Sequence, residues 1–203
     1  MENEVLIQPK RRITPEEYLE LERKAEIKSE YFDGEMFAMS GAMLEHNTII
    51  VNIARELSTQ FMNRPCTVLV TDMRTKVEST GLYTYPDIVA LCGEAEFEDE
   101  HMDTMTNPQV IIEVLSESTE SYDRGRKFIH YRSLASLSEY FLVSQTECRI
   151  ERYSRQSGDT WLYSECADPS GSIELTSVAA HLTVSSVYHK VDFERAKTKL
   201  KGR

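Results

Sequence analysis

Hydrophobic residues recur along the chain with two spacings, and these spacings predict a succession of helices and strands. Between residues 43 and 62, Ile50, Ile53, Leu57 and Phe61 follow one another at intervals of three and four residues, which places them on one side of a helix. Shorter runs rich in β-branched and aromatic residues, bounded by turn residues, are typical of strands. They predict strands at residues 30–32, 35–39, 66–78, 86–92, 109–116, 138–144 and 172–176, and a hairpin over 148–165.

Three further helices complete the predicted order of elements, at residues 14–24, at 121–136 and from about Ser185. In the first of them, Thr14 can cap the helix start. This order predicts an α/β fold of the α+β kind, with a central mixed β-sheet flanked by helices, an N-terminal helix and hairpin, and a C-terminal hairpin. No linker or repeat divides the chain, so we expect a single domain over residues 1–203.

Composition and charge narrow the classes of protein that the chain can be. It carries 34 acidic and 23 basic residues, a net charge of −11, which argues against broad, non-specific adhesion to nucleic acid. No apolar run is long enough to span a membrane or to form a signal peptide. The four cysteines are widely spaced and form no CxxC pair, which predicts free thiols in a reducing cytoplasm, and the acidic stretch 93–103 is typical of a solvated loop. We therefore expect a cytoplasmic protein with no membrane partner.

A single carboxylate, Glu113, interrupts the most aliphatic of the predicted strands, residues 109–116. Side chains alternate along a strand, and here both faces are otherwise aliphatic, as in a strand that is covered on both sides. An ionised carboxylate in that position has to be paired, has to bind a metal, or has to become neutral. A buried ion pair with Lys127 or Arg126 and a role as metal ligand both meet this requirement.

A second carboxylate, Asp87, begins the preceding predicted strand. Alone it is typical of a turn or a strand start, but two carboxylates that converge from neighbouring strands repel each other unless a divalent cation lies between them. Carboxylate oxygens, a backbone carbonyl and water suit Mg²⁺ or Mn²⁺. Lys127 follows on the next predicted helix. An isolated helix lysine is usually solvated, but near a metal it can orient water or stabilise negative charge on a phosphate. An aspartate, a glutamate and a lysine around one cation are the groups that phosphodiester hydrolysis needs.

Five segments of the chain carry a resemblance to a known family. They are YFDGEMFAMSGAMLEHN, VTDMRTKV, YPDIVALCG, NPQVIIEVLSESTESYDRGRKFIHYR and LSEYFLV. In this order they resemble the Uma-two (Uma2) family of bacterial restriction endonucleases, which belongs to the PD-(D/E)XK nuclease superfamily. The resemblance implies a restriction-endonuclease-like core and a metal-dependent endonuclease that hydrolyses DNA phosphodiester bonds.

The resemblance also implies roles for particular residues. Asp87, Glu113 and Lys127 would be catalytic. The same two acids and the Val114 carbonyl would bind Mg²⁺ or Mn²⁺. Leu115 stands where the superfamily motif has its lysine, so the resemblance implies that the lysine has moved to the following helix, as Lys127.

Two more residues, His46 and Glu35, are candidate outer members of this site. His46 alone is typical of a half-buried histidine, and Glu35 of an ordinary strand residue.

DNA is the expected substrate, and we expect a homodimer, because cutting two strands suits two-fold symmetry. Two alternatives remain open. One is a catalytically silent nuclease-fold module that binds nucleic acid or protein, which the acidic net charge favours. The other is a hydrolase of small phosphate esters with a closed pocket.

Overall fold

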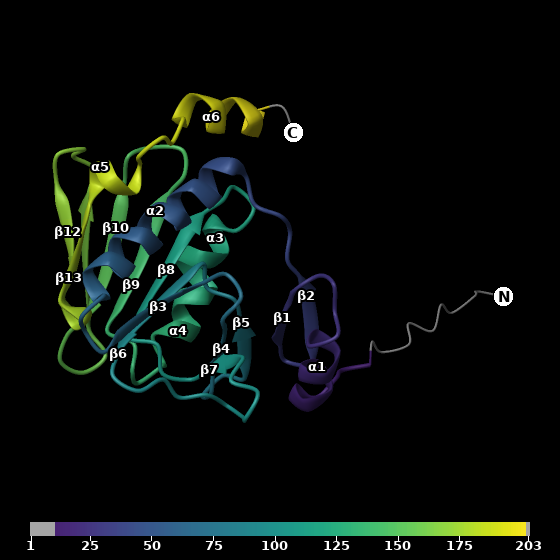
Figure 1. Cartoon of the computed structure of the whole chain (residues 1–203). Coiled ribbons are helices and arrows are strands. Elements are labelled where there is room, and N and C mark those ends of the chain that lie inside the picture. The colour runs from purple at the N-terminus through teal and green to yellow at the C-terminus, as the bar shows by residue number, and fades with distance from the viewer. Residues whose placement is uncertain (1–10, 202–203) are drawn as a thin grey trace.

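The computed structural model describes residues 11–201, and Figure 1 shows its β-sheets and the helices that cover them. Residues 1–10 and 202–203 of the predicted domain lie outside the described residues. The first helix, α1 (Pro15–Glu22), begins after Thr14, as the sequence predicts. The Glu17 backbone N–H donates to Thr14 Oγ1 at 3.2 Å, and the Thr14 N–H donates to Glu17 Oε2 at 3.0 Å. This reciprocal pair is a capping box, and it satisfies N–H groups that a helix start leaves without partners.

A six-stranded mixed sheet forms the centre of the fold. Its strands lie in the order β11, β10, β9, β8, β6, β3, and only β8 and β9 run parallel. The bounds are β3 Cys66–Val70, β6 Ile88–Cys92, β8 Val110–Leu115, β9 Glu139–Ser144, β10 Ile150–Arg155 and β11 Trp161–Cys166. The predicted mixed sheet is therefore present, and the predicted hairpin over 148–165 is formed by β10 and β11.

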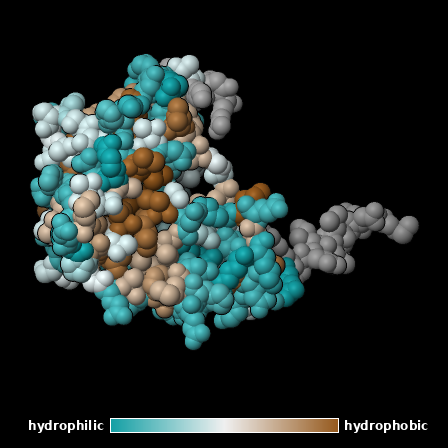
Figure 2. Space-filling view, viewed as in Figure 1, coloured by the Kyte–Doolittle hydropathy of each residue, from teal (hydrophilic) through white to brown (hydrophobic). Residues whose placement is uncertain are grey.

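The helix α2 (Leu44–Phe61) covers one face of this sheet (Figure 1). Its predicted apolar stripe is buried, and Ile53 and Leu57 have no exposed surface. The outer side of the helix is also partly hydrophobic: Leu44 and Val51 are 57% and 65% exposed, and Figure 2 shows a hydrophobic band over this part of the molecule. The same face of the sheet packs against β12 (Ser172–Leu175), β13 (Ala180–Thr183) and α5 (Val184–Val187).

A second, five-stranded sheet packs against the other face of the first, in the order β2, β1, β5, β4, β7. The bounds are β1 Ser29–Phe32, β2 Glu35–Ala38, β4 Arg74–Val77, β5 Leu82–Thr84 and β7 Thr104–Met105. The prediction of one strand over 66–78 is wrong, because Thr71 adopts a positive φ of 45° and the chain bends there. As a result β3 joins the six-stranded sheet and β4 joins the five-stranded one. Because β8 is covered on both sides, all six of its residues are buried, as its aliphatic sequence predicts.

The predicted helices after β8 and at the C-terminus are each divided. The first consists of α3 (Glu120–Tyr122), a π-helical turn (Asp123–Lys127) and α4 (Phe128–Tyr131). The second consists of α5 and α6 (Phe193–Lys201). Within residues 11–201, no helix has both the length and the apolar character that crossing a membrane requires.

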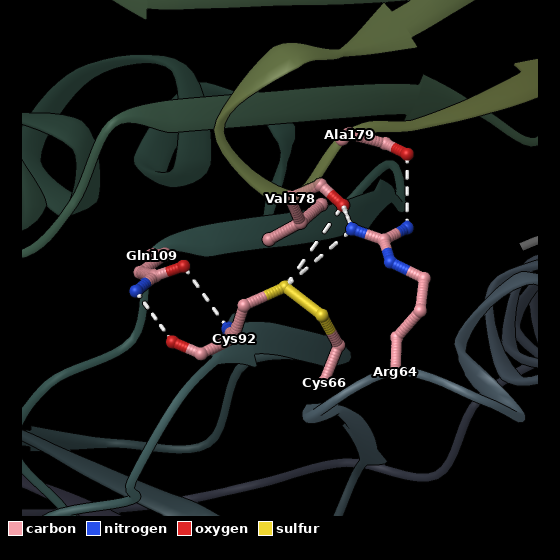
Figure 3. The surroundings of a disulfide bond; sticks show 6 residues. All are labelled: Arg64, Cys66, Cys92, Gln109, Val178 and Ala179. Carbon is pink, nitrogen blue, oxygen red and sulfur yellow. Dashed lines mark hydrogen bonds between the residues drawn. A yellow bond between two sulfur atoms is a disulfide. The ribbon is translucent and has the colours of Figure 1, made fainter.

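The prediction of four free thiols is wrong for two of the cysteines. Cys66 and Cys92 are opposite residues of β3 and β6, and they form a disulfide (Figure 3). The backbone N–H and C=O of Cys92 bond to the side chain of Gln109, at 3.0 Å each, so they point away from β3. Opposite residues that do not bond to each other through the backbone bring their side chains closest together. The pairing register of β3 and β6 creates this contact, so the spacing of the cysteines in the sequence does not reveal it. The cysteine spacing therefore does not support the expected location in a reducing cytoplasm.

The acidic stretch 93–103 is not simply a solvated loop, because arginines from other parts of the chain bind it. Arg23, just after α1, lies 2.7 Å from an oxygen of Asp99 and 2.8 Å from one of Asp103. Arg74 of β4 lies 3.0 Å from the other oxygen of Asp103 and is itself only 3% exposed. The loop is thus held against the five-stranded sheet by ion pairs.

Candidate active site

Asp87 and Glu113 lie opposite one another on two paired strands. Ile88 of β6 pairs with Ile112 of β8 in an antiparallel arrangement. Asp87, which precedes Ile88, therefore faces Glu113, which follows Ile112. The Val114 backbone N–H donates to Asp87 Oδ2 at 2.8 Å, and the Asp87 N–H donates to Glu113 Oε2 at 3.3 Å. The structure therefore brings together the two acids that the sequence places on neighbouring strands, and the backbone of Val114 holds one of them.

Lys127 reaches Glu113 from the π-helical turn. Its Nζ lies 2.9 Å from Glu113 Oε1, 3.2 Å from Glu30 Oε1 and 3.6 Å from Asp123 Oδ1. The lysine side chain is 7% exposed and those of the three acids are 4–13% exposed. A π turn spreads the helical repeat, a feature often found at functional sites, and here both Asp123 and Lys127 are buried. The expectation that an isolated helix lysine is solvated is wrong for this residue.

A ring of contacts restrains the carboxylates around this lysine. Tyr131 Oη donates to Glu113 Oε1 at 2.9 Å. Thr84 Oγ1 donates to Glu30 Oε1 and lies 3.4 Å from Tyr131 Oη. Lys127 contacts both glutamates and so closes the ring. Its five residues come from β1, β5, β8, the π turn and α4, so the ring joins the two sheets.

Burial and neighbouring charges set the pKa values in this cluster. Burial raises the pKa of Glu113 to about 8, although Lys127 acts to lower it. The carboxylates of Asp123 and Asp87 raise it further. Burial alone would lower the pKa of Lys127, but Glu113 and the other surrounding acids raise it well above its usual value. Lys127 is therefore an ammonium at neutral pH, and Glu113 is the group that burial drives towards its neutral form.

His46, near the start of α2, joins the cluster through Asp87. Its Nε2 lies 3.2 Å from Asp87 Oδ2, and the residue is 9% exposed. Its other nitrogen, Nδ1, is buried and has no hydrogen-bond partner among residues 11–201. A buried polar atom without a partner is a cost to folding.

Three titratable members of the cluster are not predicted from the sequence: Glu30, Asp123 and Tyr131. A signal exists for the second and third, because they lie four residues before and after Lys127, a spacing that places helical residues on one side. No signal exists for Glu30, which meets the lysine only after the chain has folded. The sequence suggests Glu35 as an outer residue of the site, and it lies on β2. The contact that the β1–β2 hairpin makes with Lys127 comes from Glu30 of β1.

Asp87 and Glu113 each keep an oxygen that a hard cation can bind. The described part of the chain contains no group of three or more His, Cys, Asp and Glu side chains placed to hold a metal ion. Mg²⁺ requires fewer protein ligands, since it usually keeps several waters and binds one or two carboxylates. Among the described residues, Glu113 Oε2 accepts only the 3.3 Å bond from Asp87, and no hydrogen bond reaches Asp87 Oδ1. The donor set therefore fits Mg²⁺ or Mn²⁺.

The chain matches a known family over most of its length. The sequence profile of the Uma2 family, described as "Putative restriction endonuclease", matches residues 15–185. The chain therefore belongs to the Uma2 family, and the resemblance drawn from its five segments is confirmed.

Two relatives and one solved structure extend this comparison. "Uncharacterized protein sll1609" of Synechocystis sp. is 35% identical over 164 residues, which cover 81% of this chain and 93% of the relative. "Uncharacterized protein slr1290" of the same organism is 32% identical over 182 residues, covering 90% and 94%. The crystal structure of a "putative nuclease belonging to DUF820" from Anabaena variabilis superposes with a TM-score of 0.71 at 19% identity, covering 87% of this chain and 97% of that one. This likeness confirms the predicted restriction-endonuclease-like fold.

Proposed function

We propose that the protein is a metal-dependent endonuclease of the PD-(D/E)XK type that hydrolyses DNA phosphodiester bonds. The observation that carries the proposal is the convergence of Asp87, Glu113 and Lys127 at the paired strands β6 and β8. Burial raises the pKa of Glu113 to about 8, and carboxylates perturbed in this way are concentrated at functional sites. Membership of a family described as restriction endonucleases supports the same function.

The proposed mechanism divides the chemistry between a cation and the side chains. Asp87 and Glu113 would hold one Mg²⁺ or Mn²⁺, beside the Val114 carbonyl. When bound, such an ion polarises a phosphoryl oxygen and makes water a better nucleophile. Lys127, as an ammonium, donates hydrogen bonds and does not accept a proton, so it orients the attacking water and stabilises negative charge that develops on the phosphate. His46 holds Asp87 in place through Oδ2.

The alternative function is a silent module of the same fold that binds nucleic acid or protein. The net charge of −11 favours it, since a surface rich in acid gives little general attraction for DNA. The two functions differ in one measurable outcome, which is the cleavage of a phosphodiester bond.

Plasmid cleavage tests the proposal. Supercoiled plasmid is incubated with the protein in Mg²⁺, in Mn²⁺ and in EDTA, beside Asp87→Asn and Glu113→Gln. We expect nicked or linear DNA with either metal and none with EDTA, because the two carboxylates hold the ion. Both substitutions keep the side-chain shape and remove the charge, so we expect both to abolish cleavage.

Asp72→Asn is the matched control for these variants. The Asp72 side chain is 84% exposed in the bend after β3, and among the described residues it pairs with Lys28 at 2.7 Å and not with the buried cluster. We expect this variant to cleave as the wild-type protein does. Cleavage that survives Asp87→Asn and Glu113→Gln would contradict the site, and DNA binding without cleavage in either metal would favour the silent module. The homodimer stays a prediction, which sedimentation with and without DNA would measure.

A further inference from the structure

Glu30 brings the five-stranded sheet into the candidate active site. It lies on β1, whereas Asp87 and Glu113 belong to the six-stranded sheet. Its Oε1 lies 3.2 Å from Lys127 Nζ and also accepts a hydrogen bond from Thr84 of β5. The side chain is 13% exposed, so little water competes for these contacts.

The Lys127 ammonium does not obtain its counter-charge from Glu113 alone. Glu113 Oε1 lies nearest, at 2.9 Å, but burial drives this carboxyl towards its neutral form. Glu30 and Asp123 add two further carboxylates at 3.2 Å and 3.6 Å. Glu30 therefore both balances the ammonium and contacts it from a different sheet, and the second of these effects bears on where the ammonium lies.

Contacts from three directions fix the position of an otherwise flexible group. Lysine carries its ammonium on a four-carbon stem with rotatable bonds, so one partner leaves it free to swing. Here the partners come from β1, from β8 and from the π turn itself. Thr84 and Tyr131 in turn hold the two glutamates, so the partners are restrained as well.

We propose that Glu30 is a positioning residue, which fixes the Lys127 ammonium beside Glu113 and makes the five-stranded sheet part of the active site. The catalytic consequence rests on the proposed nuclease function, but the placement of Lys127 does not. The two parts are therefore tested by separate measurements.

Lysine side-chain ¹⁵N NMR tests the placement without any substrate. A buried, multiply bonded ammonium exchanges its protons with water slowly, so the wild-type protein should give a slowly exchanging signal that is absent from Lys127→Met. In Glu30→Gln we expect this slowly exchanging signal to be lost, because the third charged partner is gone. Glu139→Gln is the matched control: Glu139 is another buried strand glutamate, 2% exposed, and pairs with Arg152 at 2.8 Å. Its substitution should leave the Lys127 signal in place.

Cleavage kinetics test the catalytic consequence. We expect Glu30→Gln to lower kcat by roughly 10- to 100-fold with little change in KM, as displacement of a catalytic group does. Glu30→Asp, which keeps the charge, should recover part of the loss, and Glu139→Gln should keep the wild-type kcat. A Lys127 signal unchanged by Glu30→Gln overturns the placement, and an unchanged kcat overturns the catalytic part. A wild-type protein that cleaves no DNA, while its Lys127 signal still depends on Glu30, refutes the nuclease function and leaves the placement standing.

Discussion

Two glutamates are buried in adjacent strands of the six-stranded sheet, and they lie on opposite faces of it. Glu113 on β8 and Glu139 on β9 are 3% and 2% exposed. The strands are parallel, with Val110 opposite Glu139 and Glu113 opposite Leu142, so the carboxylates lie three positions apart along the strands. Aliphatic residues flank Glu113 and apolar residues follow Glu139, and burial alone does not distinguish the two glutamates.

Glu139 is surrounded by donors that satisfy both of its oxygens. The backbone N–H of Thr176 donates to Oε1 at 3.1 Å, and that of Ser177 donates to Oε2 at 2.8 Å. The Ser177 hydroxyl also donates to Oε2, and Arg152 lies 2.8 Å from Oε1. These bonds anchor the turn between β12 and β13 to the sheet, which is a structural role.

Glu113 has its donors on one oxygen and a nearly open second oxygen. Lys127 and Tyr131 both contact Oε1, whereas Oε2 has only the 3.3 Å bond from Asp87 among the described residues. Burial raises its pKa to about 8. The difference between the two glutamates teaches that an oxygen with one long hydrogen bond beside other carboxylates, rather than burial, distinguishes the candidate site.

The same substitution at both positions gives the largest expected difference. Glu113→Gln should reduce metal-dependent DNA cleavage on the order of 10³-fold, because a neutral amide is a poor ligand for a hard cation. Glu139→Gln should leave the cleavage rate unchanged. Initial rates on supercoiled plasmid measure both, and equal losses in the two variants would break the comparison.

Lys127→Met should produce the largest loss of stability in the cluster. Its removal leaves Glu30 and Asp123 buried without their shared counter-charge, and takes one hydrogen-bond donor from Glu113 Oε1. Removing one partner from a buried ion pair costs about 3–5 kcal/mol. Urea unfolding monitored by circular dichroism measures the change in free energy, and Lys24→Met, at an exposed position of the N-terminal region, is the control. A change below that of the control would show that the cluster is not ionised as described.

Glu139→Gln should lower the free energy of unfolding less than Lys127→Met does, and more than Glu113→Gln does. At position 139 the amide nitrogen of glutamine replaces an oxygen that accepts hydrogen bonds, and about 1–3 kcal/mol is typical for such a loss. At position 113, where burial raises the pKa to about 8, the native side chain is largely protonated at pH 7 and glutamine resembles it. Unfolding free energies of the two variants at pH 7 test the order, and a greater loss from Glu113→Gln would reverse it.

Strand pattern and helical spacing made much of this fold predictable. The aliphatic run of β8 predicts a strand covered on both faces, and the stripe on α2 predicts the helix that covers one of them. Asp87 begins one predicted strand and Glu113 interrupts the next. The two residues converge because these strands, β6 and β8, are paired. The sequence pattern is sufficient to predict a contact between two elements when each element is itself predicted by its own pattern.

Contacts that depend on three-dimensional register could not be predicted in this way. Cys66 and Cys92 meet because β3 pairs antiparallel with β6, which no spacing rule for cysteines contains. Glu30 meets Lys127 because the two sheets pack together. The bend at Thr71, which sends β3 and β4 to different sheets, depends on a positive φ that threonine rarely adopts.

A pH series should sharpen the comparison, because it isolates the titration of Glu113. The pKa of Glu113 is raised from 4.5 to about 8 by burial, so between these values the folded protein keeps a proton that the unfolded chain releases. This group therefore contributes stability that is complete below pH 4.5 and is lost as the pH rises through 8. The Tm of the wild-type protein should fall relative to that of Glu113→Gln between pH 5 and pH 8.5, and Glu139→Gln should keep the wild-type slope. Differences between variants remove the contribution of all other titrating groups, so parallel curves for the wild-type protein and Glu113→Gln would mean that Glu113 is already ionised, like a carboxylate with a purely structural ion pair.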